Sequence, residues 1–155
     1  MGSRGSLVRH QMNMQHATCN AQRAENGAEM GTGDERKYDL EDRLLDYAAR
    51  IVRLTDALPR SRAGSHVGDQ LLRSGTSPLS NHGEAQAAES PDDFIHKLSV
   101  CLKELKESRR WLRLVAKAQL VKETRCVEPL LAETEELIRI FGASIRTARA
   151  RRTKK

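Results

Sequence analysis

Apolar residues recur at helical spacing in four stretches of the chain, and each stretch predicts one amphipathic helix. The first predicted helix covers residues 39–58, with Asp39 as its N-cap and Pro59 directly after its end. Residues three and four positions apart share one face of a helix, so the apolar positions form one buried stripe. That stripe consists of Leu44, Tyr47, Ala48, Ile51, Leu54 and Leu58.

The second helix, predicted over residues 65–89, is the least regular of the four. Gly68, Gly75, Pro78 and Gly83 lower its helix propensity, and we expect a kink at the proline. Small residues let a neighbouring helix approach closely, so one face is expected to pack inward. This face carries Gly68, Leu72, Gly75 and Leu79.

The opposite face of the second helix is polar and carries Gln70, Arg73, Ser77, Asn81 and Glu84. Three interpretations remain open for it: a subunit interface, solvated surface and a ligand site. A buried arginine needs a partner from another helix or another chain, because an unpaired buried charge is costly. We therefore predict that this polar face contributes to an oligomer interface.

The third helix has the clearest start, because Ser90 supplies an N-cap, Pro91 suits the first helical position and two aspartates fill the first turn. The helix is predicted to reach about Ala118, and its solvent-exposed face is predicted to carry Lys103, Lys106, Arg110 and Arg113. Its predicted buried residues are Ile95, Leu98, Cys101, Leu102, Leu105, Leu112 and Val115.

The fourth helix is predicted to begin near Val127 or Pro129, with an ion pair between Glu135 and Arg139 one turn apart. Four amphipathic helices joined by short turns predict an all-α fold, an antiparallel up-and-down four-helix bundle over residues 34–148. The apolar face of the fourth helix carries Leu130, Leu131, Thr134, Leu137, Ile138, Phe141 and Ile145.

Two terminal segments fall outside this pattern. Residues 1–33 are polar and lack a helical repeat, so they are interpreted as a flexible leader. This leader is either vector-derived sequence or the result of a start upstream of Met30, and both explanations remain open.

Residues 149–155 are interpreted as a basic tail. The last ten residues hold six basic groups and no acid, which accounts for the whole formal net charge of +6: Arg146, Arg149, Arg151, Arg152, Lys154 and Lys155. Such a cluster attracts nucleic acid or another polyanion, although basic ends are also common solvated surface.

Composition narrows the class of protein. Aromatic residues make up 3% of the chain, and Leu, Ala, Glu, Lys and Arg dominate, which favours helix over sheet. No apolar run is long enough for a membrane span or a signal peptide. Cys19, Cys101 and Cys126 are odd in number and widely spaced, so neither disulfides nor a zinc site is indicated. A cytoplasmic location is expected.

Side chains with catalytic potential do not converge in the sequence pattern. No two of His66, His82 and His96 have the spacing of a helical metal site, and Glu84 and Glu89 lie about 140° apart on a helix. We predict no enzyme activity, no metal and no cofactor. Cys101 lies on an apolar stripe, where an inert buried thiol is expected. Trp111 flanks the same stripe and is interpreted as core or interface, with base stacking as the alternative.

Several runs of the sequence closely resemble the 23S ribosomal RNA intervening-sequence proteins, also called four-helix bundle proteins. They are residues 70–77 (QLLRSGTS) with Asn81, residues 84–90 (EAQAAES) and residues 93–98 (DFIHKL). Residues 50–55, 111–112 and 128–131 add to the likeness, which covers about residues 36–150. The chain departs from the commoner family pattern at Pro78, Leu79 and His82.

The resemblance implies a bundle that assembles into a homopentameric ring and is encoded in some bacteria within insertions of the large ribosomal RNA gene. The accessory variability proteins of diversity-generating retroelements are similar, and they bind a reverse transcriptase and nucleic acid. The preferred hypothesis is therefore an oligomer that binds RNA, DNA or a nucleoprotein partner through basic charge. The alternative is a structural or regulatory assembly with protein partners only. No membrane partner is expected.

Overall fold

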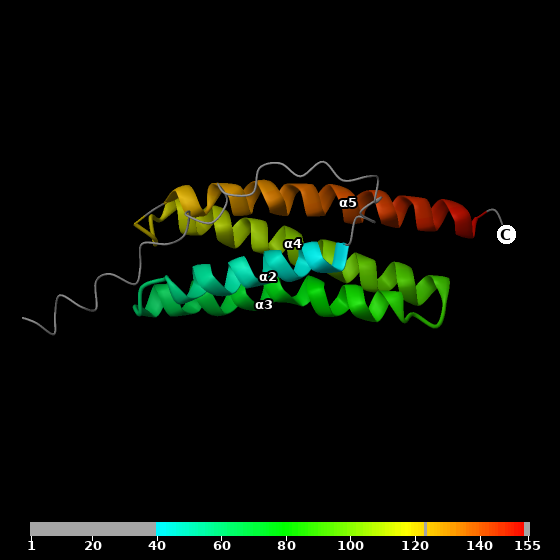
Figure 1. Ribbon diagram of the computed structural model, residues 1–155, viewed down its shortest axis with the longest axis horizontal. Helices are drawn as coiled ribbons and strands as arrows, with labels where there is room; N and C mark the ends of the chain where they lie inside the picture. Colours follow the sequence, from blue (N-terminus) through cyan, green and yellow to red (C-terminus); the bar gives the residue numbers. More distant parts are fainter. Residues whose placement is uncertain (1–39, 123, 154–155) are drawn as a thin grey trace, which may run out of the picture. The chain divides into compact units, whose positions relative to one another are not determined.

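The computed structural model describes residues 40–122 and 124–153, and in this part of the chain all regular elements are helices, without a strand (Figure 1). Four long helices are present in it: α2 (Leu40–Asp56), α3 (Arg62–Gln86), α4 (Pro91–Lys117) and α5 (Glu128–Arg152). A short 3₁₀ turn, η1 (Thr124–Cys126), precedes α5. The predicted all-helical class is thereby confirmed. The predicted leader, residues 1–33 with Cys19, lies outside the described residues.

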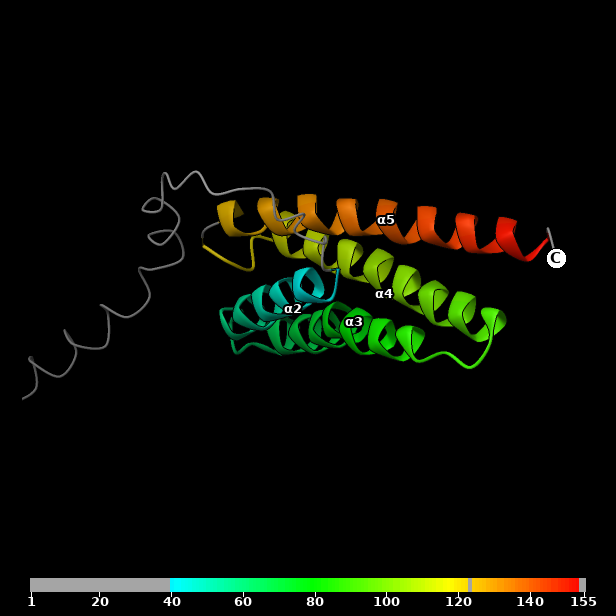
Figure 2. The same ribbon diagram turned by 45° about the vertical axis from the view of Figure 1, so that its right-hand side comes forward.

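Each helix packs against its neighbour in the sequence. α3 contacts both α2 and α4, α4 contacts α5, and α2 meets α5 over a smaller area. Figures 1 and 2 show the α2–α3 and α4–α5 connections at one end of the helices and the α3–α4 connection at the other. α2 is the shortest, so it runs beside only part of the other three (Figure 1). None of the described helices has the length and apolarity that crossing a membrane requires.

Serine caps fix the starts of α3 and α4. The Ser90 hydroxyl accepts a hydrogen bond from the Asp93 amide at 3.1 Å, as the cap pattern predicted. Ser61 does the same for the Gly64 amide at 3.1 Å, so α3 begins before its predicted start near residue 65. A Cβ on Gly64 would lie 2.0 Å from the Pro59 carbonyl oxygen, so only glycine fits this connection.

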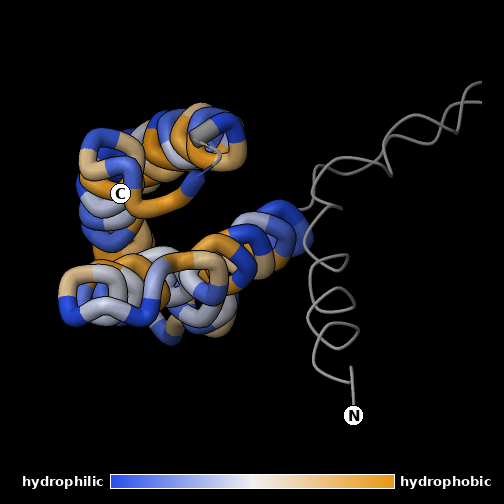
Figure 3. The backbone as a smooth tube through the Cα atoms, turned by 90° about the vertical axis from the view of Figure 1, so that its left-hand side faces the viewer, coloured by the Kyte–Doolittle hydropathy of each residue, from blue (hydrophilic) through white to orange (hydrophobic). Residues whose placement is uncertain are grey.

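The predicted core positions are largely confirmed. Every apolar position predicted for α2 is buried, and hydrophobic and hydrophilic positions alternate along each helix (Figure 3). Leu102, Leu131 and Ile138 are only half-buried, because they lie at the edges of their stripes. The completely enclosed residues include Ile51, Leu71, Leu105, Leu112, Leu137 and Phe141.

The inward face of α3 is rotated from the predicted one. Gly68 and Gly75 are buried as predicted, but Leu72 is 39% exposed and Leu79 is half-buried. α3 lies between α2 and α4, so its buried surface must serve two neighbours and is centred on other positions. A Cβ on Gly75 would meet the Ile51 side chain at 2.7 Å, which shows how closely α2 and α3 approach there. The residues that α3 buries are Gly64, Val67, Gly68, Leu71, Ser74, Gly75, Pro78, His82 and Ala85.

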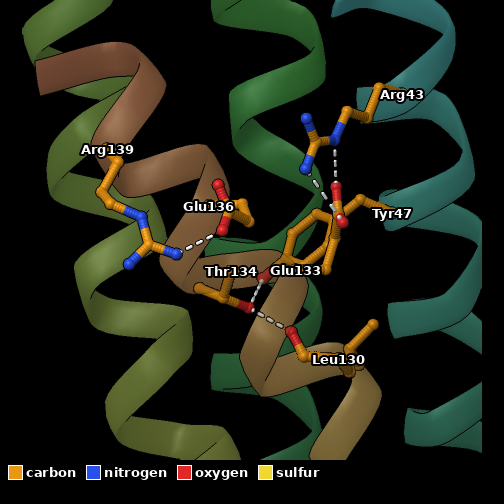
Figure 4. Close-up of polar contacts among 7 residues, drawn as sticks. All are labelled: Arg43, Tyr47, Leu130, Glu133, Thr134, Glu136 and Arg139. Carbon is orange, nitrogen blue, oxygen red and sulfur yellow. Dashed lines mark hydrogen bonds and ion pairs between the residues drawn. The ribbon is translucent and has the colours of Figure 1, made fainter. Parts of the chain in front are cut away.

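Four buried residues with hydroxyl groups, one from each helix, lie within the apolar core. The Tyr47 and Thr134 hydroxyl oxygens are 3.0 Å apart, and Thr134 also donates to the Leu130 carbonyl at 2.6 Å (Figure 4). The Ser108 and Ser74 hydroxyls are 3.1 Å apart. Burial raises the pKa of Tyr47 above its usual value, although hydrogen bonds to Thr134 and Ser108 oppose this. Buried polar groups with partners favour one helix register over others.

Ion pairs join α5 to its neighbours. Arg43 of α2 donates from Nε and Nη2 to the two carboxylate oxygens of Glu133, at 2.5 and 3.1 Å (Figure 4). The predicted pair between Glu135 and Arg139 is wrong. Glu135 instead accepts from Arg109 of α4 at 3.0 and 3.1 Å, and Arg139 pairs with Glu136. Glu135 faces α4, so it pairs with Arg109 of that helix and not with Arg139 on its own helix.

Candidate nucleic-acid interface

The basic residues predicted near the C-terminus lie on the last turns of α5. Residues 149–155 were predicted as a separate tail, but α5 continues through Arg152. Lysines and arginines in a last helical turn interact favourably with the helix dipole, which helps the helix to extend. Lys154 and Lys155 lie outside the described residues. The described members of the cluster are all exposed: Arg146, Arg149, Arg151 and Arg152.

These arginines surround the end of α5 and do not line one groove. At 3.6 residues per turn, Arg151 projects about 140° away from Arg146. Arg152 Nη1 lies 2.6 Å from Asp92 Oδ1 in the first turn of α4. Both side chains are more than half exposed, so solvent screens the pair and its contribution to stability is small. The end of α5 therefore offers positive charge in several directions, reduced by one acid.

The predicted polar stripe of α3 runs along the boundary between α3 and α4. Arg73 Nη2 donates to Glu107 Oε1 of α4 at 2.9 Å and to Gln70 Oε1 at 3.2 Å. Asn81 donates to the Ser77 carbonyl and hydroxyl, both at 3.0 Å. The structure thus supplies Arg73 with a partner on another helix of the same chain, so its pairing does not require a second subunit. The missed signal was Glu107, which is far from Arg73 in sequence.

Glu84, the last residue of that stripe, pairs with Lys97 of α4. The ammonium group of Lys97 has its pKa raised above the usual value, mainly by its hydrogen bond to Glu84. Glu89 lies beyond the end of α3 and is exposed. The two carboxylates therefore do not form a paired acid and base.

The three histidines of the described residues lie in different environments. His82 is buried, and its ring meets Phe141 edge-on with centroids 6.2 Å apart. His66 is exposed and lies edge-on to Trp111 at 5.9 Å, and His96 is exposed on α4. In residues 40–122 and 124–153, no group of three or more histidine, cysteine or acidic side chains is placed to hold a metal ion.

Cys101 is fully buried, and its thiol lies 3.6 Å from the Pro78 carbonyl oxygen of α3. Burial raises the pKa of this thiol to about 12. The thiolate is the reactive form, so Cys101 is inert at neutral pH, as predicted. α3 continues without a break through Pro78.

Several basic residues of α4 were predicted from the sequence to be exposed to solvent, but they were not recognised as one surface. The α4 basic stripe consists of Lys103, Lys106, Arg110, Arg113 and Lys117, all exposed. Their spacing of three and four residues is the signal that predicts a common helix face. Trp111 lies beside the stripe, half-buried, and its indole N–H donates to Glu107 at 3.4 Å. Glu107, Arg110, Trp111 and Leu114 line a hollow there.

Comparison with a family model matches residues 36–143, a span that contains α2, α3, α4 and most of α5, to the 23S rRNA-intervening sequence proteins. The chain belongs to this family. The matched span of the 23S rRNA-intervening sequence protein includes the whole α4 basic stripe and ends before Arg146. The basic C-terminal residues thus lie beyond the family match.

A solved structure resembles this 23S rRNA-intervening sequence protein. It is a protein of unknown function from the S23 ribosomal protein family of Bacteroides thetaiotaomicron, solved at 1.70 Å resolution. The two chains share 33% sequence identity with a TM-score of 0.63, over 68% of this chain and 96% of the other. A comparison with curated proteins gave no match.

Proposed function

We propose that this protein is a non-catalytic, oligomeric four-helix bundle that binds nucleic acid, with RNA as the preferred partner. The exposed arginines at the end of α5 carry the proposal, because they concentrate the net charge of the chain at one place. Membership in the 23S rRNA-intervening sequence protein family supports an RNA-related role. The protein is expected to act in the cytoplasm of a bacterium.

The proposed assembly is an antiparallel bundle repeated in a homopentameric ring. The alternation of the helix connections between the two ends supports the antiparallel arrangement (Figure 1). Oligomerisation would bring several basic ends together, and a polyvalent surface binds a long polyanion more tightly than one copy does. A nucleic-acid enzyme such as a reverse transcriptase is a further partner to test, in keeping with the resemblance to the accessory variability proteins.

Replacing Arg151, Arg152, Lys154 and Lys155 with serine tests the proposed function. We expect weaker binding to RNA, measured by fluorescence anisotropy, and a smaller dependence of affinity on salt. Each contact between a basic side chain and a phosphate adds about 0.7 to the log–log salt slope on single strands, so the slope should fall by at most about 3. The mass of the oligomer should not change, because none of these residues belongs to the proposed interface on α3.

Two results would overturn the proposal for the α5 end. Full binding by this serine variant at physiological salt would place the site elsewhere on the bundle. No binding by the wild-type protein at low salt would favour protein partners only. Metal-dependent RNA cleavage that disappeared in Glu84→Gln would contradict the non-catalytic role.

The oligomer interface has its own test in light scattering. The polar stripe of Gln70, Arg73, Ser77, Asn81 and Glu84 is retained as the proposed interface, although Arg73 also pairs with Glu107. Arg73→Ala should lower the mass of the oligomer at tens of micromolar protein. Leu45→Lys provides the comparison, because Leu45 is 55% exposed on α2. A mass loss in Leu45→Lys alone would move the interface to α2, and a monomeric wild type would remove the assembly.

A further inference from the structure

The α4 basic stripe points directly away from the core. At about 100° per residue, Lys103, Lys106, Arg110, Arg113 and Lys117 fall within about 80° of one another. Along the same stretch of α4, the buried residues Leu105, Leu112 and Val115 lie on the opposite side. The five charges therefore share a single outward face about 21 Å long.

Within the described ranges, the charges of the stripe lack acidic partners. In the described part of the chain, none of its five members forms an ion pair within 4.0 Å. The acids that flank it are already engaged by other arginines. Glu107 pairs with Arg73 on the α3 side, and Glu135 pairs with Arg109 on the α5 side. The flanking carboxylates are thus drawn away from the stripe.

A row of like charges at this spacing opposes helix formation, because residues three and four positions apart repel each other. Lys117 lies in the last turn of α4, where the helix dipole favours a positive charge. The other members of the stripe are exposed, and none forms an ion pair with another described residue, so they contribute little to the stability of the fold. The electrostatic repulsion within the stripe is relieved when a polyanion lies along the helix and releases its counterions. The geometry of the charges matches that kind of partner.

We infer that the α4 basic stripe binds the phosphate backbone of a single-stranded nucleic acid that runs along α4. The inference rests on the proposed nucleic-acid function and assigns it a second surface, separate from the end of α5. Arg152 pairs with Asp92 in the first turn of α4, and Trp111 lies about 29 Å further along that helix. The two basic surfaces are therefore distinguishable by experiment.

The hollow beside the stripe favours a single strand over a duplex. Trp111 and Leu114 give it an aromatic and an apolar wall, and Arg110 joins it to the stripe. Proteins that bind single strands combine a basic track with an aromatic side chain on which an unpaired base stacks. Paired bases of a duplex cannot enter such a hollow. Phosphates on the stripe and one base against Trp111 complete the proposed contact.

Trp111 is the only tryptophan of the chain, so its fluorescence reports on this surface. The test titrates the wild-type protein and two variants with poly(U) and poly(dT), following both tryptophan fluorescence and affinity against salt. The stripe variant carries Lys106→Gln, Arg113→Gln and Lys117→Gln, which leaves Arg110 beside Trp111 unchanged. The control carries Arg53→Gln, Arg60→Gln and Arg62→Gln, three exposed arginines at the α2–α3 connection. Both variants lose the same net charge.

We expect both polymers to quench Trp111 in the wild type and in the control. In the stripe variant the fluorescence change should disappear, and affinity at about 0.1 M salt should fall by about 10- to 100-fold. The log–log salt slope should fall by about 2. A response to poly(U) alone would identify RNA as the source of the phosphates, and an equal response to poly(dT) would extend the site to DNA; both support the stripe.

Four outcomes would overturn the inference. If the stripe variant bound with wild-type affinity and slope while the serine variant of the α5 end did not, the proposed function would stand without the stripe. If the stripe variant and the control lost equal affinity, only net charge would matter. If the stripe variant changed the mass of the oligomer in light scattering, the stripe would be a contact between copies. Absence of wild-type binding to either polymer at low salt would remove the proposed function as well.

Discussion

The hydroxyl oxygens of Tyr47 on α2 and Thr134 on α5 lie 3.0 Å apart, with both side chains buried. α2 and α5 share a smaller contact than the other neighbouring helices do, so this hydrogen bond and the Arg43–Glu133 ion pair are prominent in joining them (Figure 4). A buried hydroxyl pair requires both helices to hold one rotation and one register. The polar contact therefore specifies where α2 sits on α5.

Tyr47→Phe is expected to lower the free energy of unfolding by about 1 kcal/mol, measured by urea denaturation. The loss is moderate because Thr134 keeps its hydrogen bond to the Leu130 carbonyl. Thr134→Val should cost more, because it also removes that second bond. The double variant tests coupling between the hydroxyls. Strictly additive losses would show that the two groups do not interact.

Gly75→Ala and Gly83→Ala should change stability in opposite directions although both lie in α3. A methyl group at Gly75 meets Ile51 at 2.7 Å, so we expect a loss of about 1–3 kcal/mol. No atom lies within 4 Å of a methyl group at Gly83, so alanine there should add about 0.5–1 kcal/mol through helix propensity. Thermal unfolding of both variants measures the difference. A stabilising Gly75→Ala would mean that α2 and α3 do not pack this closely.

Raising the pH should destabilise the protein through Cys101. Its thiol has a pKa of about 12 in the fold against 9.0 as the ordinary value, so the unfolded chain loses its proton first. The contribution of this thiol to the free energy of unfolding is therefore fully present below pH 9. It declines as the pH rises towards 12, by at most about 1.4 kcal/mol per pH unit. Cys101→Val should show a smaller decline above pH 9 in urea denaturation. Identical declines in both proteins would contradict the assignment to Cys101.

Lys106→Gln combined with Arg113→Gln should stabilise the protein at low salt by about 1 kcal/mol, because the double variant removes all four like-charge pairs between neighbouring members of the stripe. Glutamine has a helix propensity close to that of lysine and arginine, so the gain reflects charge. Salt should abolish the gain, since it screens exposed charges. Arg113→Lys, which keeps the charge, is the control. A loss of stability in the double variant would reveal a structural role for the stripe.

Much of the fold could be predicted from the spacing of residues along the chain. The stripe that contains Leu44 and Ile51 is buried, and α4 begins at Pro91 after its Ser90 cap. Both features depend on residues only a few positions apart, and this spacing can be seen in the sequence itself. The prediction failed at Ser61, which caps α3, because the turn before it was taken as the end of the preceding helix only.

The candidate sites depend more on contacts between helices. The exposed α5 arginines and the outward α4 lysines follow from sequence, but the pairing of the flanking acids with other arginines does not. Glu107 could have paired with Lys103 or Arg110 on its own helix, and the fold instead brings Arg73 to it. A pairing of that kind joins residues far apart in the chain, so no local pattern predicts it.

The sequence by itself determined four amphipathic helices, most of their buried positions and the concentration of net charge at the C-terminal end. Tertiary structure alone decided the rotation of each helix, which exposes Leu72 and joins Tyr47 to Thr134. It also decided which charges are paired and which remain available on α4. The physical reason is that helix formation follows local spacing, whereas rotation and charge pairing depend on which helices become neighbours.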